Sequence, residues 1–418
     1  MAGARKLAVL AALRTSVAPA ASDLKVRMRR RLGWSVHALE EGHLSVLRSR
    51  TSSTSRNSVD FVIVGVIIML LCLGIVMVYS ASNVIAANKF DDPFFYPKRQ
   101  LIWAILGIIA MFWFSRYDYH NLRKHASKIA IASFAMLVLV LIVGVNRGGS
   151  KAWLGIGSLG IQPSEFAKLG LIVFLAHMLC DAGERMQSFW RGFIPPLATA
   201  VAAVGLIMLE PDLGQSVVIM GTTLLMMFAA GTRMAHLGGF FGVGLLGFGG
   251  LVAAAPYRMQ RVVAFLDPWK YPKDEGYQII QSLYALGSGG ILGLGLGNSR
   301  QKFMYLPEPQ TDFIFSIIGE ELGFLGGLSL LLLFGLLVWR GVRIAIYAPD
   351  EFGSLLGVGI TGMIAVQVLI NIGVVTGSMP ATGITLPFIS YGGSSLTLIL
   401  SGVGILLNIS KQAVFPHR

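Results

Sequence analysis

One stretch of the chain decides its fold class, and from Tyr305 to Trp339 it reads YLPEPQTDFIFSIIGEELGFLGGLSLLLLFGLLVW. A polar segment braced by prolines leads to Asp312, and an apolar run follows, interrupted only by Glu320 and Glu321. That run is long enough to cross a bilayer, which takes about 20 mostly apolar residues. Because ionisable groups at a membrane segment are costly, Asp312 is a candidate functional residue. Partial desolvation raises the pKa of such a carboxyl toward that of a useful general base.

The composition extends the same interpretation to the whole chain. Of its 418 residues, 54% are hydrophobic and only 13% are charged, whereas soluble proteins carry about 25% charged residues. About ten apolar runs are long enough to span a membrane, and they lie roughly at 60–82, 100–115, 127–145, 163–180, 193–209, 212–231, 235–255, 312–339, 354–377 and 393–410. We therefore expect an all-α polytopic membrane protein of about ten transmembrane helices, with a long extracellular loop at 256–311 between helices 7 and 8.

The net charge of +13 does not indicate a nucleic-acid partner, because the excess Lys and Arg flank the apolar runs and crowd the N-terminus. Membrane lipids and an anionic lipid-linked substrate are the expected partners. Lys and Arg are enriched in short cytoplasmic loops, and here Arg56, Arg116, Arg233 and Arg340 mark loops of one parity. Both termini are therefore expected in the cytoplasm. The loops of the other parity are expected outside, and they span residues 83–99, 146–162, 256–311 and 377–392.

The only sizeable soluble-looking segment is residues 1–57. It is rich in Arg, Ala and Ser and poor in acids, which loosely resembles an organellar transit peptide. We interpret it as a disordered basic cytoplasmic tail, or as the product of an upstream start site. Residues 58–410 then form the transmembrane domain, and 411–418 form a short cytoplasmic tail.

Polar clusters begin several of the apolar runs on the expected outer side. Pro163 and Glu165 suit the first turn of a helix, so a capped helix start explains Glu165. It does not explain Lys168, a cation on the same face where the helix dipole disfavours one. We therefore favour a functional pair of Glu165 and Lys168 over a structural ion pair. Asp212 is either a helix cap or a functional carboxylate, and the sequence leaves both open.

Other polar side chains suit a phosphorylated sugar. Trp153 alone would be an ordinary interfacial aromatic, but beside Lys151 it is suited to a sugar face and a phosphate. Gln278, Gln281 and Ser282 fall on one side of a short amphipathic helix in the long loop, where they suit sugar hydroxyls. The loop cations that suit a pyrophosphate are Arg258, Arg261 and Lys302.

Three further features can be explained by structure as well as by function. The glycine-rich run 287–297 is not a dinucleotide fingerprint, because no strand precedes it, and we expect a flexible loop. Glu320 and Glu321 lie roughly 12 Å below Asp312 along the expected helix, at 1.5 Å per residue. Their carboxyl groups must form ion pairs, take up a proton or contact water. Bonds to a neighbouring span explain them at least as well as chemistry. The uncharged, Gly- and Pro-punctuated stretch 381–395 predicts a re-entrant or broken-helix element packed against protein or a cavity.

Several motifs together make the chain similar to the SEDS family (shape, elongation, division and sporulation), which are peptidoglycan polymerases of the bacterial cytoplasmic membrane. The motifs, in chain order, are Tyr79-Ser80-Ala81-Ser82, Asp92-Pro93-Phe94-Phe95, Gln162-Pro163-Ser164-Glu165, Pro211-Asp212-Leu213-Gly214, Gly276-Tyr277-Gln278, Leu306-Pro307-Glu308, Thr311-Asp312-Phe313-Ile314-Phe315 and Ile389-Ser390-Tyr391-Gly392-Gly393-Ser394-Ser395. The resemblance covers about 58–410. It is nearer to the division and sporulation branch, with FtsW and SpoVE, than to the elongation branch with RodA.

The resemblance implies an inverting glycosyltransferase that polymerises lipid II on the outer face of the membrane. The family's essential carboxylate matches Asp312, and its polar cavity residues match Glu165, Lys168 and Asp212, with Lys151 and Trp153 nearby. Glu308 in the matching loop motif is a further candidate for substrate binding. Relatives often carry an acid just before Pro272, where this chain has Tyr271. Any role of that acid is in doubt here, unless Asp274 or Glu275 substitutes for it.

The resemblance also implies the ligands and partners. The substrates are lipid II and an undecaprenyl-pyrophosphate-linked glycan. A divalent cation, Mg²⁺ or Mn²⁺, is expected with ligands the sequence does not identify, and no organic cofactor is expected. The expected partners are a class B penicillin-binding transpeptidase, docked along the eighth and ninth spans, and other division proteins.

Two other functions fit the same residues. A lipid II flippase would also show about ten spans, broken helices and carboxylates within the membrane, although here most polar candidates cluster on one side. A scaffold without chemistry that recruits the transpeptidase is the second alternative. The sequence leaves open whether the role is in division or in sporulation.

Overall fold

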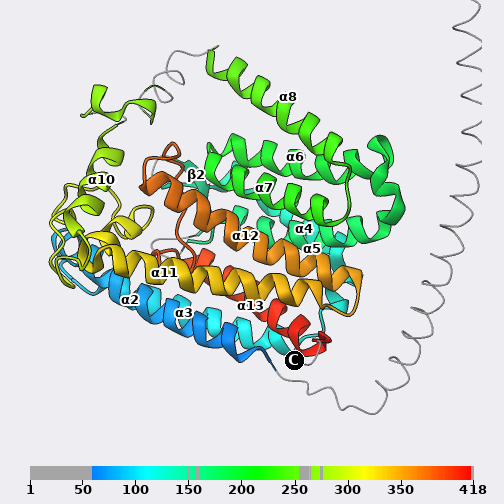
Figure 1. Cartoon of the computed structure of the whole chain (residues 1–418), viewed down its shortest axis with the longest axis horizontal. Coiled ribbons are helices and arrows are strands. Elements are labelled where there is room, and N and C mark those ends of the chain that lie inside the picture. Colours follow the sequence, from blue (N-terminus) through cyan, green and yellow to red (C-terminus); the bar gives the residue numbers. More distant parts are fainter. Residues whose placement is uncertain are drawn as a thin grey trace, which may run out of the picture. The chain divides into compact units, whose positions relative to one another are not determined.

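The computed structural model describes residues 59–147, 150–155, 160–253, 263, 265–273 and 276–415 (Figure 1). In this part of the chain each of the expected spans is a helix. The helices are α2 (Phe61–Phe90), α3 (Phe95–Arg116), α4 (His120–Val143), α5 (Pro163–Ala182), α6 (Ile194–Leu209), α7 (Leu213–Ala229), α8 (Met234–Ala253), α11 (Ile314–Ile346), α12 (Glu351–Val375) and α13 (Gly393–Gln412). Within these described residues, seven helices are long and apolar enough to cross a membrane. The expected all-α polytopic membrane fold is confirmed.

Short elements connect the long helices on both sides. β1 (Val145–Arg147) and β2 (Ser150–Trp153) form an antiparallel hairpin, with Val145 opposite Trp153. Other short elements are the 3₁₀-helices η2 (Gly183–Gln187) and η4 (Pro268–Lys270) and the π-helix η3 (Phe189–Phe193). The amphipathic helix expected in the long loop is α10 (Tyr277–Gly289). The predicted tail at 1–57 lies outside the described residues, and so do residues 416–418.

The helix starts follow ordinary capping chemistry. The Asp60 carboxylate accepts hydrogen bonds from the backbone N–H groups of Val62 and Ile63, and so caps α2. Pro163 occupies the first turn of α5, where its missing N–H is not needed. Asp350 caps α12 by accepting from the backbone N–H of Gly353 at 2.9 Å.

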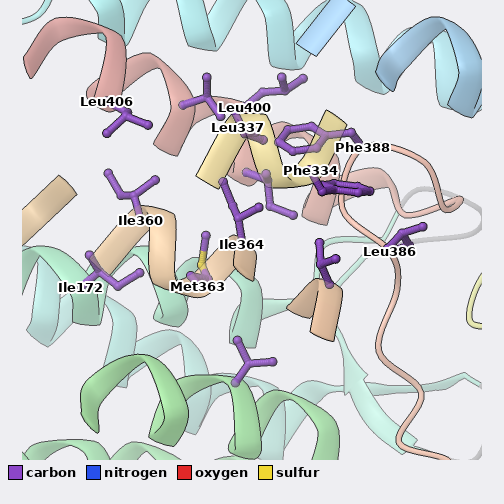
Figure 2. Close-up of a cluster of buried hydrophobic side chains, with 14 of the residues drawn as sticks. Ile172, Phe334, Leu337, Ile360, Met363, Ile364, Leu386, Phe388, Leu400 and Leu406 are labelled. Atoms are coloured by element: carbon purple, nitrogen blue, oxygen red, sulfur yellow. The ribbon is translucent and has the colours of Figure 1, made fainter. Parts of the chain in front are cut away.

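The buried core lies where α11, α12 and α13 meet α5 (Figure 2). Phe334 and Leu337 of α11, Ile364 of α12 and Leu400 of α13 are buried there. The loop 376–392 between α12 and α13 joins this core through Leu386 and Phe388, shown in Figure 2. Apolar anchoring of this kind fits the re-entrant element that the sequence predicts, because its backbone lies against protein.

One end of the helical bundle gathers the segments that carry most of the candidate residues. There α5, α7, α11 and α13 begin and α12 ends, and we call it the site face. Hydrogen bonds join these ends: Gln162 at the start of α5 bonds the Asp212 carboxylate before α7, and its backbone N–H donates to Ser394 Oγ in α13 at 3.2 Å. Figure 1 shows the loop before α13 turning in among these helix ends.

The helix α11 departs from the uninterrupted span expected at 312–339. Gly323 has φ 69° and ψ −168°, so the helix is broken there and continues to Ile346. A Cβ at Gly323 would lie 2.3 Å from the backbone nitrogen of Gly293, and one at Gly289 would lie 1.9 Å from the carbonyl of Gly319. The glycine run 287–297, which we expected to be a flexible loop, is therefore packed backbone to backbone against the break.

Candidate active site

Asp312 lies in the wall of a cavity of about 580 Å³ on the site face. The wall is formed by the segment before α11, by α10 and the residues before it, and by the α12–α13 loop. Its polar side chains include Asp312, Lys273, Tyr277 and Gln278. The volume is that of an ordinary small-molecule site, and the mixture of carboxylate, amide, phenol and ammonium suits sugar hydroxyls and phosphate.

The environment of Asp312 favours its neutral form. Burial raises its pKa to about 7, and the nearby negative charges of Glu308 and Asp212 act in the same direction. The α12–α13 loop comes close at Gly383, where an added Cβ would lie 3.7 Å from Asp312 Oδ2 and φ is 70°. A carboxyl group that is half ionised near neutral pH is suited to accept a proton from a substrate hydroxyl.

Glu308 lies on the same segment as Asp312. It is exposed, its backbone has φ 48°, and its carboxylate accepts a hydrogen bond from Gln310 Nε2 at 2.9 Å. Its negative charge is the second cause of the raised pKa of Asp312. The structure therefore brings Glu308 and Asp312 together, as their neighbouring family motifs at 306–308 and 311–315 suggest.

Asp212 caps α7, which is one of the two roles left open for it. Its Oδ1 accepts from the backbone N–H of Gln215 at 3.0 Å, and its Oδ2 accepts from Gln162 Nε2 at 3.0 Å. Burial raises the pKa of Asp212, and the charge of Glu165 adds to this effect. Its charge also contributes to the raised pKa of Asp312, so the cap is coupled to the cavity electrostatically.

Glu165 and Lys168 form an ion pair inside the bundle. Lys168 Nζ lies 2.9 Å from Glu165 Oε2, both side chains are 2% exposed, and Gln215 Nε2 donates to Glu165 Oε1 at 2.7 Å. We expected them in one cavity with Asp312, but Lys168 lines a separate small cavity with Thr222. The structural ion pair is therefore present, and a functional role of the pair stays a prediction.

The α12–α13 loop runs between the start of α7 and Asp312, because an added Cβ at Gly383 of this loop would lie 3.7 Å from Asp312 Oδ2. A Cβ at Gly214 would lie 2.5 Å from the carbonyl oxygen of Thr382, so this loop passes directly against the start of α7. Periodicity along each helix shows which residues share a face, but it does not show that a loop from far along the chain lies between two faces.

The three polar side chains expected on one face of α10 have different surroundings. Gln278 lines the cavity, and Gln281, half-buried, is not among the described residues of its wall. Ser282 is fully buried, where its Oγ donates to the carbonyl of Val375 and bonds Ser316 Oγ. Ser282 therefore joins α10 to α11 and α12 and is not among the described residues of the cavity wall, so its expected role in substrate binding stays a prediction.

Lys302 is also a structural residue. It is 2% exposed; its Nζ donates to the carbonyl of Gly297 at 2.5 Å and lies 3.4 Å from Glu321 Oε1. Glu321 also accepts from Ser80 Oγ of α2, while Glu320 accepts from the Arg300 backbone N–H at 2.9 Å and from Ser299 Oγ. Lys302 is not among the described residues of the cavity wall, so its pyrophosphate role stays a prediction. Of the two explanations left open for the carboxylates, a bond to a neighbouring span is observed for Glu321, whereas Glu320 bonds the loop before α11.

Other candidates are placed only in part. Trp153 is partly buried at the end of β2, which packs against α4 and α5. Lys151 lies in β2, but its side chain is outside the described residues, as are Arg258 and Arg261. The possible substitutes Asp274 and Glu275 are outside them too.

Sequence reasoning missed two residues beside Asp312. Lys273 supplies a cation to the cavity wall. Asn371 of α12 donates to the backbone carbonyl of Asp312 at 2.8 Å. A lone asparagine in an apolar helix was a usable signal for Asn371, because a buried amide needs partners. Nothing near Lys273 distinguished it from the other loop cations.

No protein cage for a metal ion is found among the described residues, where no three or more His, Cys, Asp or Glu side chains gather suitably. Mg²⁺ is usually held by one or two carboxylates together with substrate phosphates, so a site of this kind needs the substrate to complete it.

Comparison with known proteins gives consistent matches along the chain. A family model described as cell cycle protein, covering FtsW, RodA and SpoVE, matches residues 61–414. The chain is 55% identical over 363 residues to stage V sporulation protein E of Bacillus subtilis (strain 168), covering 86% of this chain and 99% of that protein. It is 42% identical over 355 residues to the probable peptidoglycan glycosyltransferase FtsW of Geobacter sp. (strain M18), covering 84% and 97%.

Solved structures agree with the fold. One, titled structural coordination of polymerization and crosslinking by a peptidoglycan synthase complex, matches with TM-score 0.72 and 32% identity over 84% of this chain and 98% of that one. The rod shape determining protein RodA of Thermus thermophilus matches with TM-score 0.64 and 30% identity over 86% and 99%.

Proposed function

We propose, from the premise that this chain belongs to the FtsW–RodA–SpoVE family, that it is a peptidoglycan glycosyltransferase which polymerises lipid II into glycan strands. The observation that carries the proposal is Asp312, a carboxyl group with a pKa raised to about 7 in the wall of a sugar-sized cavity. The two most similar relatives named above are a stage V sporulation protein E and an FtsW, so we propose that the strands serve septal or spore cortex wall.

In the proposed reaction Asp312 takes the proton from the 4-hydroxyl of the N-acetylglucosamine of the incoming lipid II. That oxygen forms a bond to the anomeric carbon of the growing chain. The bond from this carbon to the pyrophosphate breaks, and undecaprenyl pyrophosphate leaves with the electron pair and inversion at carbon. A general base of this kind contributes roughly 10²–10⁴-fold to the rate.

The leaving pyrophosphate needs positive charge close to the reacting carbon. Lys273 is the cation on the described wall of the cavity, and we assign it to the pyrophosphate. Gln278 on α10 is suited to a sugar hydroxyl or amide of the same substrate. The expected Mg²⁺ or Mn²⁺ would be held mainly by pyrophosphate oxygens, where it would neutralise charge on the leaving group.

We place the site face outside the cytoplasmic membrane and both termini inside. The support is the Lys and Arg distribution, because Arg116 at the end of α3 and Arg340 near the end of α11 lie at the opposite ends of their helices from the site face. The class B transpeptidase is proposed to dock along α11 and α12. Exposed apolar side chains on α11, such as Leu332 at 65%, are available to a single-span partner or to lipid.

The test is polymerisation of lipid II by the full-length protein with its transpeptidase partner, with glycan strands separated by gel electrophoresis. We expect strands with the wild type and with Asp91→Asn, which changes an exposed carboxylate, and none above background with Asp312→Asn. Flipping of lipid II in proteoliposomes without any strand formation would instead favour the flippase.

A further inference from the structure

Three consecutive carbonyls immediately before α11 are each held by a donor from the last two helices or the loop between them. The carbonyl of Gln310 accepts from the backbone N–H of Tyr391 at 2.8 Å. Those of Thr311 and Asp312 accept from Ser390 Oγ at 2.6 Å and from Asn371 Nδ2 at 2.8 Å. We call these three hydrogen bonds the carbonyl clamp. It fixes the backbone on which the Asp312 carboxylate is mounted.

Asn371 joins two walls of the cavity through one amide group. Its Nδ2 donates to the carbonyl of Asp312 and also to that of Ile384, each at 2.8 Å, and its side chain is 1% exposed. Asp312 and Ile384 both line the cavity. The amide therefore uses both of its N–H donors to set the separation of these walls, and its removal leaves two carbonyls without this donor.

Ser390 connects the clamp to the rigid interior. Its Oγ donates to Thr311 and accepts from the backbone N–H of Leu386 at 2.8 Å. Leu386 and Phe388 are buried in the core shown in Figure 2, and Gln100 Nε2 of α3 donates to the carbonyl of Ser390 at 3.1 Å. The loop is thus held on both sides, and the clamp extends its rigidity to Asp312.

We propose that Asn371 and Ser390 are positioning residues that set the distance and orientation of the Asp312 carboxylate relative to the opposite cavity wall. This inference rests on the proposed role of Asp312 as the base. Neither side chain is among the described residues of the cavity wall, so both act through the backbone. Because a misplacement of about 1 Å costs about 10²-fold in rate, loss of the clamp should lower the chemical step more than substrate binding.

The experiment measures kcat and KM for lipid II with the full-length protein and its transpeptidase partner. Asn371→Ala should lower kcat about 10- to 100-fold and leave KM within about threefold. The matched control is Gln367→Ala, one turn earlier on α12 and also 1% exposed, which should keep kcat within about twofold. Hydrogen exchange in a peptide covering 308–318 should rise for Asn371→Ala and stay unchanged for Gln367→Ala.

Ser390 supplies the second arm, which serves if Asn371→Ala does not fold. Ser390→Ala should lower kcat, and Ser390→Thr, which keeps the hydroxyl, should restore most of it. A folded Asn371→Ala or Ser390→Ala with wild-type kcat overturns the proposal, and so does an equal loss in Gln367→Ala. Full activity of Asp312→Asn instead overturns the function on which it rests, so the two failures are distinguishable.

Discussion

The acid side of the pH–rate profile should report the ionisation of Asp312. A general base works only when it is deprotonated. The polymerisation rate is therefore high above the pKa of the base and falls as the pH drops below that pKa. With the pKa at about 7, about nine tenths of the carboxyl groups are ionised at pH 8 and about one tenth at pH 6. We therefore expect kcat/KM to fall about tenfold between these pH values. An aspartate at its ordinary pKa of 3.8 would give a flat profile.

Removal of a neighbouring charge should move this profile in a known direction. Glu308 raises the pKa of Asp312 through its negative charge, so Glu308→Gln should lower that pKa and shift the acid limb to lower pH. A shift of about half a unit makes the ionised fraction at pH 6 about threefold larger. Among the described residues, the other charged groups near Asp312 are Asp212 and Lys273, and they are unchanged in this variant.

The assay is the initial rate of lipid II polymerisation at low substrate concentration, in buffers of constant ionic strength from pH 5.5 to about 8.5. Asp91→Asn is the matched control, since it removes an exposed carboxylate outside the cavity and its φ of 56° is one that asparagine tolerates. The reasoning is refuted if kcat/KM is flat from pH 6 to about 8. It is also refuted if Glu308→Gln moves the limb to higher pH.

Three further predictions follow from the same geometry. Lys273→Gln should lower kcat/KM about 10- to 100-fold, since a charged hydrogen bond contributes about 1.5–3 kcal/mol; an unchanged value contradicts its pyrophosphate role. Lys302→Met should destabilise the protein by about 3–5 kcal/mol, because the buried carboxylate of Glu321 then lacks its cation. In thermal unfolding, the double variant with Glu321→Gln should regain part of the lost stability. Gly293→Ala should destabilise by more than about 1 kcal/mol, since its Cβ would lie 2.2 Å from the Glu321 carbonyl at φ 82°, whereas Gly287→Ala, with open space, should not.

The helices were predictable because a bilayer demands long apolar runs, and each expected run is a helix. The break at Gly323 was not predictable. Its surroundings stay apolar on the C-terminal side, and a glycine in such a run is common in membrane helices. At the break, Gly289 and Gly293 pack tightly against α11, and this packing brings together residues some 30 positions apart in the chain, which a local sequence pattern does not show.

The site was predictable at Asp312 and Gln278, because one stands at the entrance of a span and the other lies on the polar face of a short helix. The structural role of Lys302 was not predictable, because Lys302 resembles any other loop cation until the structure shows Glu321 beside it. Asn371 was overlooked for the reverse reason. Its partners are backbone carbonyls of other segments, and a sequence pattern does not show which carbonyls lack a donor.

The most direct measurement separates binding from chemistry in Asp312→Asn. Lipid II binding and single-turnover polymerisation are measured with the same full-length preparation in proteoliposomes, at saturating substrate and pH 8. We predict that the dissociation constant stays within about threefold of the wild type while the single-turnover rate falls about 10²–10⁴-fold. A folded Asp312→Asn protein that binds lipid II and polymerises it within about twofold of the wild-type rate would contradict the assignment of Asp312 as the base.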